Sequence, residues 1–262
     1  MEVIILEDSH AVATLSAQRI SDLINKKPTA VLGLATGSTP IALYQKLISL
    51  YQQGTLSFRH VVTFNLDEYI GISPNNPQSY HAFMKRELFD SIDIQPHNSH
   101  LPTCERAGET SCQVGAAYEQ AIAEAGGIDL QVLGIGSNGH IGFNEPSSSL
   151  VSRTRVKTLT QATVNDNNRL FEEGEFQPRL AMTMGIASIL DSQQVILLAT
   201  GAQKARAVCN AIEGPLSAMC PASALQLHKQ VTFILDEAAA SKLENHHYYR
   251  WVRRINESLE KN

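Results

Sequence analysis

Residues 129–146 read DLQVLGIGSNGHIGFNEP, and this stretch determines how the rest of the chain is interpreted. It begins as a short apolar run and then breaks at glycines, which is typical of a buried strand followed by a βα-type loop. Within eight residues the loop supplies Asn138, His140 and Glu145. Ligands of open α/β sheets bind at the carboxyl ends of the strands, so we expect these polar side chains to lie at such an edge.

Three glycines in this stretch, Gly134, Gly136 and Gly139, also satisfy the pattern G-x-G-x-x-G. A dinucleotide-binding fingerprint requires a helix after the glycines and an acidic residue about 20 positions later. Here Pro146 and three serines follow, which are poor residues for a long helix. We therefore favour a loop whose glycines let the backbone approach a small polar ligand, with His140 as a proton-transfer group. Spacing alone leaves open a structural histidine that caps a helix or binds a backbone carbonyl.

Composition limits the classes of protein that need to be considered. At 262 residues and 28.7 kDa the chain fits one large domain, although two small domains also fit. The net charge of −5 and a pI of about 6.0 argue against nucleic acid as the main partner. No apolar run reaches the roughly 18 residues of a membrane span, and the N-terminus lacks the basic region of a signal peptide. The four cysteines form no C-x-x-C pair, so the sequence suggests neither a zinc site nor a redox pair. Without an export signal we expect reduced thiols in a cytoplasmic protein.

Strands and helices are expected to alternate along the chain. Apolar runs predict strands at 3–6, 30–35, 60–66, 130–135, 195–200 and 231–235. Helical periodicity and start signals predict helices at 9–27, 40–53, 79–88, 112–125, 182–190 and 202–212, and further helix after the last strand. Ser9 is the expected cap of the first helix. The alternation predicts an α/β fold with an open, mostly parallel, Rossmann-like sheet and helices on both faces.

The segment GIGSNGHIGFNEP resembles the signature of the glucosamine-6-phosphate deaminases, which isomerise and deaminate glucosamine 6-phosphate to fructose 6-phosphate and ammonia. The resemblance implies a single sugar-phosphate isomerase/deaminase domain over 1–262, a hydrolase that needs no metal and no cofactor. It also implies that His140 opens the sugar ring and that Glu145 and Asn138 hold its orientation. Some relatives carry Asp at the position of Asn138. An amide can fix the tautomer of a ring but supplies no negative charge.

A second carboxylate follows the third predicted strand, in the segment NLDEYIG at 65–71. From the residues alone, Asp67 is more readily explained as a cap or a solvent-facing acid. The segment resembles the part of the deaminases in which this aspartate moves a proton from C2 to C1, which implies that Asp67 is the general base. For that role we expect partial burial to raise the pKa of Asp67.

The loop TGSTP at 36–40 joins a predicted strand to a predicted helix, with Thr39 expected at the N-cap and Pro40 in the first helical position. Free backbone N–H groups at a helix N-terminus bind anions, and phosphate is a natural occupant. A plain capped turn would select the same residue types. No Gly-Lys-Ser/Thr follows, so the loop is not a P-loop. The resemblance to the deaminases implies that Gly37, Ser38 and Thr39 bind the substrate phosphate.

Two cations match phosphate-binding residues of the same family. Lys204 is expected in the first turn of a helix, where a cation opposes the helix dipole unless an anion lies between them. Arg169 lies in a polar, acidic stretch at 165–177 that has the composition of a mobile lid. The resemblance implies that both side chains contact the phosphate, although Lys204 taken alone could be a surface lysine.

The stretch that follows the central motif, SSSLVSRTRVKTLT at 147–160, is rich in basic residues and hydroxyls. Taken alone it is a solvated basic segment. It is similar to a stretch that helps to bind N-acetylglucosamine 6-phosphate in the allosteric branch of the family. Ser149, Arg155 and Lys157 match that pattern. The family resemblance further implies a homo-oligomer, without giving the number of subunits.

Two other functions deserve comparison with the deaminase interpretation. A 6-phosphogluconolactonase is similar in fold but tends to carry Asp-Glu-Arg where this chain has Asp67, Glu68 and Tyr69, and to lack the run FNEP at 143–146. A sugar-phosphate sensor of a transcription regulator would carry a helix-turn-helix at its N-terminus, where this chain has a predicted strand. Both comparisons favour the deaminase.

Overall fold

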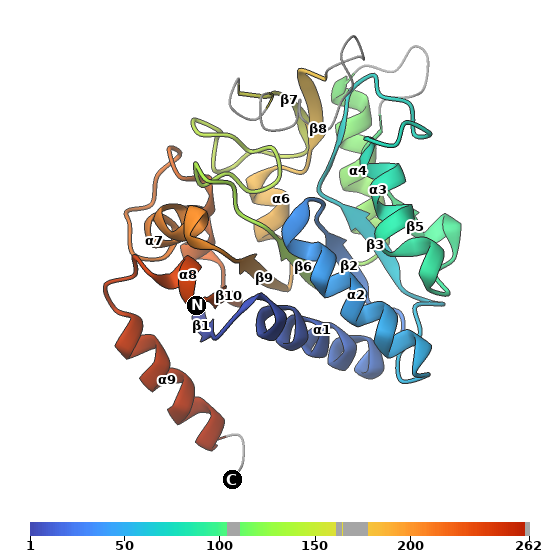
Figure 1. The fold of residues 1–262 in the computed structure, drawn as a ribbon. Helices are drawn as coiled ribbons and strands as arrows, with labels where there is room; N and C mark the ends of the chain where they lie inside the picture. The colour runs from blue at the N-terminus through green and yellow to red at the C-terminus, as the bar shows by residue number, and fades with distance from the viewer. Residues whose placement is uncertain (104–110, 161–163, 165–177, 260–262) are drawn as a thin grey trace.

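A seven-stranded parallel sheet forms the centre of the protein (Figure 1). The computed structural model describes residues 1–103, 111–160, 164 and 178–259. All neighbouring strands of the sheet run parallel, which confirms the predicted open, mostly parallel sheet. The strand order is β1 (Glu2–Leu6), β10 (Val231–Asp236), β9 (Gln194–Ala199), β6 (Leu130–Leu133), β2 (Val31–Leu34), β3 (Val62–Asn65) and β5 (Ser99–His100).

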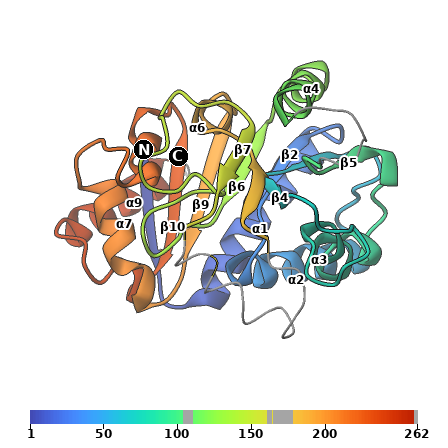
Figure 2. The ribbon, with the colours of Figure 1, turned by 90° about the horizontal axis from the view of Figure 1, so that it is seen from above.

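Helices cover both faces of this sheet, as predicted, and Figure 2 shows the layers from above. Successive strand residues point to opposite faces, so β2 sends Leu32 and Leu34 into one core and Val31 into the other. The first core contains side chains of α1 (Ser9–Lys26), α2 (Ser38–Gln52) and α3 (Tyr80–Glu87). The second contains side chains of α4 (Ser111–Glu124), α6 (Ile186–Leu190), α7 (Ala205–Ile212) and α8 (Glu237–Ala240).

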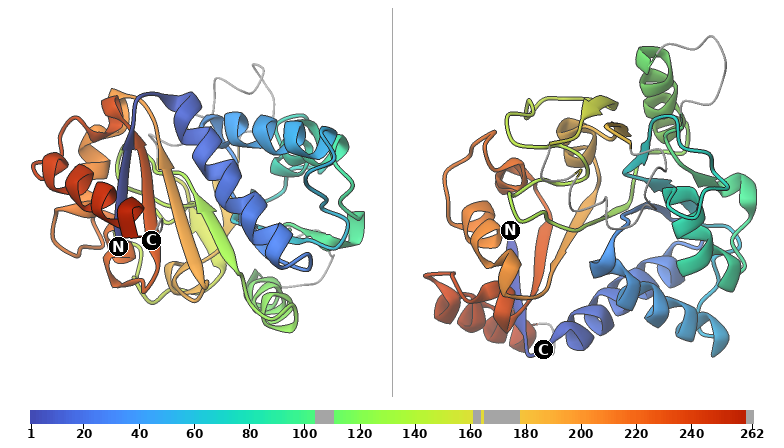
Figure 3. Two further views of the ribbon diagram at one scale, coloured as in Figure 1. Left: turned by 90° about the horizontal axis from the view of Figure 1, so that it is seen from below. Right: turned by 45° about the horizontal axis from the view of Figure 1, so that its top comes forward.

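The remaining helices are short or lie at the end of the chain. α9 (His246–Leu259) lies beside β1 at the edge of the sheet (Figure 3). None of the helices in the described ranges is both long and apolar enough to cross a membrane. Short three-ten helices occur at Phe89–Ser91 (η1), Pro96–Asn98 (η2), Ala202–Lys204 (η3) and Pro221–Leu227 (η4).

A second, antiparallel sheet of three strands stands beside the carboxyl edge of the large one. It consists of β4 (Asp67–Tyr69), β8 (Leu180–Thr183) and β7 (Arg155–Thr158), in that order. Asp67, Thr183 and Arg155 stand opposite one another across its three strands. The small sheet therefore places the proposed base in register with a residue of the basic segment.

The predicted helix at 182–190 is wrong in its first half. Residues up to Thr183 belong to β8, and α6 begins only at Ile186. The backbone N–H of Met184 donates to the carbonyl of Leu66 at 2.7 Å, which extends the pairing with the segment before β4. A Cβ on Gly185 would come within 2.1 Å of the carbonyl oxygen of Ser152, so only glycine allows this approach. Long-range strand pairing thus overrides the local helical pattern.

The start of α1 is also corrected. Asp8, and not Ser9, caps this helix, because its Oδ1 accepts a hydrogen bond from the backbone N–H of Ala11 at 2.8 Å. Ser9 is the first helical residue instead. Its side chain is therefore available at the sheet edge where the strands end.

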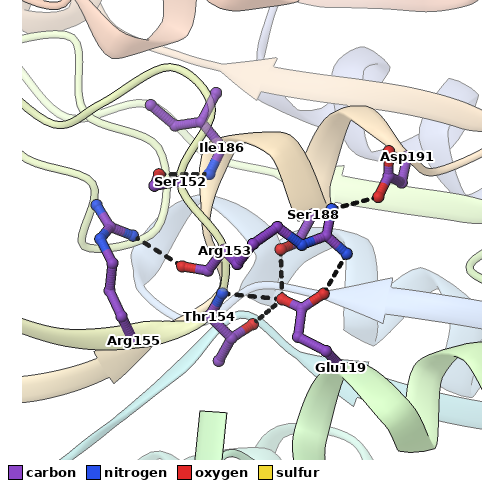
Figure 4. A network of polar contacts seen from close by, with 8 residues as sticks. All are labelled: Glu119, Ser152, Arg153, Thr154, Arg155, Ile186, Ser188 and Asp191. Carbon is purple, nitrogen blue, oxygen red and sulfur yellow. Dashed lines mark hydrogen bonds and ion pairs between the residues drawn. The ribbon is translucent and has the colours of Figure 1, made fainter. Parts of the chain in front are cut away.

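A partly buried carboxylate ties the basic segment to the helices beneath it (Figure 4). Glu119 of α4 accepts hydrogen bonds from the backbone N–H of Thr154 at 2.8 Å, from the Thr154 hydroxyl and from Ser188 of α6. Arg153 pairs with Glu119 and with Asp191. Burial raises the pKa of Glu119, but the hydrogen bonds from Ser188 and Thr154 and the charge of Arg153 outweigh it, so the pKa lies below its usual value.

Removing this carboxylate should loosen the segment that leads into β7. We expect Glu119→Ala to lower the free energy of unfolding by about 2–4 kcal/mol at pH 7, since it leaves several buried donors without an acceptor. A lowered pKa stabilises the fold above the unfolded value of about 4.3, so the difference should shrink as pH falls below it. Urea unfolding at pH 7 and pH 4 measures both effects. Asp191→Asn, at a side chain that is 66% exposed, is the control and should change stability by less than about 1 kcal/mol.

Candidate active site

The predicted site residues gather at the carboxyl edge of the large sheet. From β2 the chain continues through β3 to β5 on one side, and from β6 it continues through β9 to β10 on the other. β2 and β6 are neighbours, so their junction is the point where the strand order reverses, which is where open α/β sheets bind ligands. The two loops that leave this junction are the glycine-rich loop after β6 and the TGSTP loop after β2.

The loop after β6 is a compact turn that the glycines make possible. The backbone N–H of Gly136 donates to the carbonyl of His140 at 2.9 Å, and that of Gly139 donates to the carbonyl of Gly136 at 3.0 Å. A Cβ on Gly136 would lie within 2.4 Å of the imidazole of His140. Gly136 therefore leaves the space that the ring occupies. No helix follows the loop, which instead forms a small bridge between Ile141 and Asn144.

Within this turn His140, Glu145 and Asn138 contact one another. Nδ1 of His140 lies 3.4 Å from Oε2 of Glu145, without an aligned hydrogen bond. The amide of Asn138 donates to the same Oε2 at 2.9 Å, while its oxygen accepts from the backbone N–H of His140 at 3.1 Å. The Glu145 side chain is 2% exposed and that of His140 is 25% exposed. Asn138 therefore links a buried carboxylate to a histidine that is partly exposed to solvent.

Asp67 lies against the same loop. A Cβ on Gly142, whose φ is +53°, would come within 3.3 Å of Oδ2 of Asp67, so the loop backbone passes directly over the carboxylate. Burial raises the pKa of Asp67 to about 8, the negative charge of Glu68 adds to the increase, and the backbone N–H of Phe143 lowers it. This agrees with the expected direction. A carboxyl group with such a pKa is a strong base that is ionised only above neutral pH.

Asn144 and Thr183 support the loop and were not assigned a role from the sequence. The amide of Asn144 donates to the carbonyls of Ile141 and Met184 at 2.9 and 2.8 Å, and its oxygen accepts from Arg155 at 2.9 Å. The hydroxyl of Thr183 accepts from the backbone N–H of Phe143 at 3.0 Å. Both side chains are fully buried. Asn144 belongs to the quoted motif, but only the position of β8 reveals what it binds.

A cavity of about 250 Å³ lies between the starts of α1 and α2 and the end of β9, and several of the predicted phosphate-binding residues line it. Ser38 and Thr39 from the start of α2 line it, together with Lys204. The sequence did not single out the other polar residues of the wall, which are Ser9, Thr200 and Gln203. Ser9 reaches this cavity because β1, β10 and β9 are neighbours, a pairing that no local pattern reveals.

Two details of the predicted phosphate site are corrected. α2 begins at Ser38 with Gly37 as its N-cap, so Thr39 is not the cap. Gly37 has φ +100°, a conformation that favours glycine, which explains the residue at this turn. Lys204 ends the three-ten helix η3 and caps α7, and so precedes the first turn in which it was expected. The second predicted cation, Arg169, and the predicted lid at 165–177 lie outside the described residues.

The residues assigned to an allosteric ligand lie next to the site. Arg155 and Lys157 are two residues apart on β7 and therefore point to the same side of that strand. The guanidinium of Arg155 contacts Asn144 in the loop after β6, and partial burial of the guanidinium lowers the pKa of Arg155. Ser149 is exposed in the loop that precedes β7.

Comparison with known proteins identifies the family. Residues 7–234 match the family described as glucosamine-6-phosphate isomerases/6-phosphogluconolactonase. The chain belongs to this family. The glucosamine-6-phosphate deaminase of Colwellia psychrerythraea is 58% identical over 256 residues, which cover 98% of this chain and 95% of that protein. The glucosamine-6-phosphate deaminase of a Marinomonas species is 58% identical over 260 residues, which cover 99% and 98% of the two chains.

Solved structures of the glucosamine-6-phosphate isomerase/6-phosphogluconolactonase family confirm the fold. A monomeric glucosamine-6-phosphate deaminase superposes with a TM-score of 0.88 at 43% identity, over 92% of this chain and 100% of that one. The 6-phosphogluconolactonase of Trypanosoma cruzi superposes with a TM-score of 0.72 at 21% identity, over 93% and 97% of the two chains. The second likeness concerns the fold alone.

The buried carboxylate of Asp67 should reduce the stability of the fold. Its pKa is about 8, above the usual 3.8, so the folded state binds the proton more tightly and loses stability as pH rises between these values. We therefore expect Asp67→Asn to raise the free energy of unfolding by a few kcal/mol at pH 9 and by less at pH 5. Urea unfolding of both proteins at the two pH values measures this. The exposed Asp90 is the control, and a variant at Asp67 that is less stable than the parent at pH 9 would contradict the expectation.

Proposed function

We propose that the protein converts glucosamine 6-phosphate and water to fructose 6-phosphate and ammonia. The observation that carries this proposal is the arrangement at the sheet edge, where the Asp67 carboxyl lies under the loop that holds His140, beside a cavity lined by Lys204. Isomerisation of an amino sugar needs a base for a carbon-bound proton, a second group for ring opening and a site for the phosphate. The full-length relatives named glucosamine-6-phosphate deaminase support the same reaction.

Ring opening is assigned to His140. The imidazole removes the proton of the C1 hydroxyl and delivers a proton to the ring oxygen, which yields the open-chain aldehyde. Glu145 lies 3.4 Å from Nδ1 of His140 and stabilises the positive charge that the ring gains in between. Asn138 binds both the backbone of His140 and the carboxylate of Glu145, so it holds the pair in place without adding charge.

Isomerisation is assigned to Asp67. Its carboxylate takes the proton from C2, which leaves an enolamine between C1 and C2, and then returns the proton to C1. Because its pKa is about 8, Asp67 is basic enough to take the C2 proton and acidic enough, once protonated, to give it back. Water then adds to the imine at C2, and the C–N bond breaks to release ammonia. Ser38, Thr39 and Lys204 anchor the phosphate in the neighbouring cavity, with Gly37 providing the turn and Arg169 as a second cation.

The assay follows from this assignment. We expect the purified protein to release ammonia and fructose 6-phosphate from glucosamine 6-phosphate, with kcat/KM rising as pH passes through about 8, where Asp67 becomes ionised. Asp67→Asn should lower kcat by about a hundredfold or more, the scale of a general base. Coupled assays of both products measure this. Turnover of 6-phosphogluconolactone without ammonia release would assign the site to a lactonase, and sugar-phosphate binding without either reaction would indicate a sensor.

We further propose that the chain is regulated and self-associates. Arg155 and Lys157 form a basic face on β7 that could accept a second sugar phosphate such as N-acetylglucosamine 6-phosphate, with Ser149 in the adjacent loop. Arg155 would pass the effect of binding to the catalytic loop through Asn144. A homo-oligomer is supported by exposed apolar side chains spaced three or four residues apart on α9, which are Tyr248, Trp251, Ile255 and Leu259.

We also propose that the chain forms a single domain and that the protein is cytoplasmic. One sheet with a core on each face supports a single domain over 1–262. The cysteines that the structure describes as free thiols, Cys209 and Cys220, are compatible with a cytoplasmic location.

Lys157 offers a test of regulation because it lies outside the catalytic loop. We expect N-acetylglucosamine 6-phosphate to lower the half-saturating substrate concentration roughly fivefold or more. Lys157→Ala should remove this response and leave kcat without effector unchanged. Steady-state kinetics with and without the effector measure this, and sedimentation velocity on the same samples gives the oligomeric state. A hyperbolic rate curve that ignores the effector, in a protein that sediments as a monomer, would contradict both proposals.

A further inference from the structure

A second buried carboxylate lies immediately after the proposed base and has no part in the reaction described above. Glu68 is 3% exposed. Its Oε1 accepts hydrogen bonds from the backbone N–H groups of Tyr69 at 2.9 Å and Tyr80 at 3.0 Å, and its Oε2 accepts one from His81 at 2.9 Å. Three backbone donors therefore converge on one side chain.

These donors favour the negatively charged form of Glu68. Tyr80 and His81 are the first two residues of α3, and Ser79 caps the next N–H, that of Ala82, at 3.0 Å. The positive end of the helix dipole thus faces the carboxylate. A proton on either oxygen would have to compete with a backbone N–H that already points at it. Both oxygens are occupied by such donors, so the charge is held in a fixed place.

The fixed charge is close to Asp67 but makes no hydrogen bond with it. Neighbouring residues of a strand point to opposite faces, so the two carboxylates of β4 are separated by the backbone between them. The charge of Glu68 raises the pKa of Asp67, second in effect to burial. The other titratable groups whose charges couple to Asp67 are tyrosines, of which Tyr69 lies on β4, Tyr80 on α3 and Tyr118 on α4.

These tyrosines do not titrate in the range where Asp67 does. Burial raises the pKa of Tyr69, Tyr80 and Tyr118 above the usual 10.0, so all three stay neutral near pH 8. Of the two residues that stand opposite Asp67 in the described part of the small sheet, Thr183 and Arg155, only Arg155 is a cation. Its guanidinium contacts Asn144. Among the described groups whose charges couple to Asp67, Glu68 is therefore the one that carries a charge throughout the neutral pH range.

We propose that Glu68 is a positioning residue for the base: held ionised at the N-terminus of α3, it keeps a negative charge beside Asp67 and so sets the pH range over which Asp67 exchanges a proton with the substrate. This inference rests on the proposed role of Asp67 as the base. It explains why a buried carboxylate is placed next to another one, an arrangement that destabilises the fold. Repulsion between the two negative charges makes Asp67 a stronger base than burial alone would.

The test compares the protein with Glu68→Gln, which removes the charge and keeps the shape. Removal of the charge lowers the pKa of Asp67, so the acidic limb of the kcat/KM profile should move to lower pH by about one pH unit. At the alkaline plateau kcat should fall, because the base becomes weaker. The matched control is Glu213→Gln, since Glu213 also binds two backbone N–H groups, those of Glu244 and Asn245, but lies at the end of α7. Its acidic limb should not move.

A second measurement does not depend on activity or on a variant at Glu68 that folds. Carboxyl ¹³C shifts of the unaltered protein, assigned with Asp67→Asn and Glu68→Gln, follow both groups during a pH titration. Glu68 should stay ionised while Asp67 takes up its proton. The proposal is overturned if Glu68 takes up a proton first, or if Glu68→Gln lowers kcat and leaves the titration of Asp67 in place. If Glu68 stays ionised while Asp67 takes up its proton, but the protein shows no deaminase activity, the proposed function is rejected and the charge coupling between the two groups is kept.

Discussion

The pairing of β2 with β6 is the contact on which the site depends. On one side of this pair the sheet continues with β3 and β5, and on the other side with β9 and β10. The loops after β2 and β6 therefore lie next to each other at one edge of the sheet. Because every neighbouring pair in this sheet is parallel, the loops after β2, β6 and β9 open on the same side. The loop after β2 and the histidine loop are neighbours for this reason, although four strands of the described chain lie between Ser38 and His140.

The second constraint is the small sheet, which holds the carboxyl group of Asp67 in a buried position. Asp67 starts β4 and stands opposite Thr183 across the strands. Thr183 and Asn144, a residue of the loop after β6, are both buried and hydrogen-bonded to the backbone of that loop. These contacts keep the loop over Asp67 and exclude water from it. The same burial that raises the pKa of Asp67 opposes folding when the group is ionised. A buried carboxylate of this kind lowers the stability of the fold, as is common at sites of chemistry.

The basic segment before and within β7 connects the surface to this site. Glu119 binds Thr154 and Ser188, and Arg153 ties the segment to Asp191. The next residue, Arg155, reaches inward to Asn144. A change in how β7 is held would therefore reach the catalytic loop through one guanidinium and one amide. This continuous set of polar contacts connects the basic segment to the loop after β6.

The resemblance of the motifs to the deaminase family, and not local patterns, assigned roles to Asp67, His140, Glu145 and Lys204. Local patterns in the sequence were enough to predict the parallel sheet and most helix positions. The reason is that apolar runs mark buried strands, and glycines with polar residues mark the loops that follow them. Tertiary structure alone decided that 180–183 is a strand, that Ser9 lines the same cavity as Ser38 and Lys204, and that Asn144 binds Met184 and Arg155. It also decided the pKa of Asp67, because desolvation and a neighbouring charge depend on contacts between segments far apart in the chain.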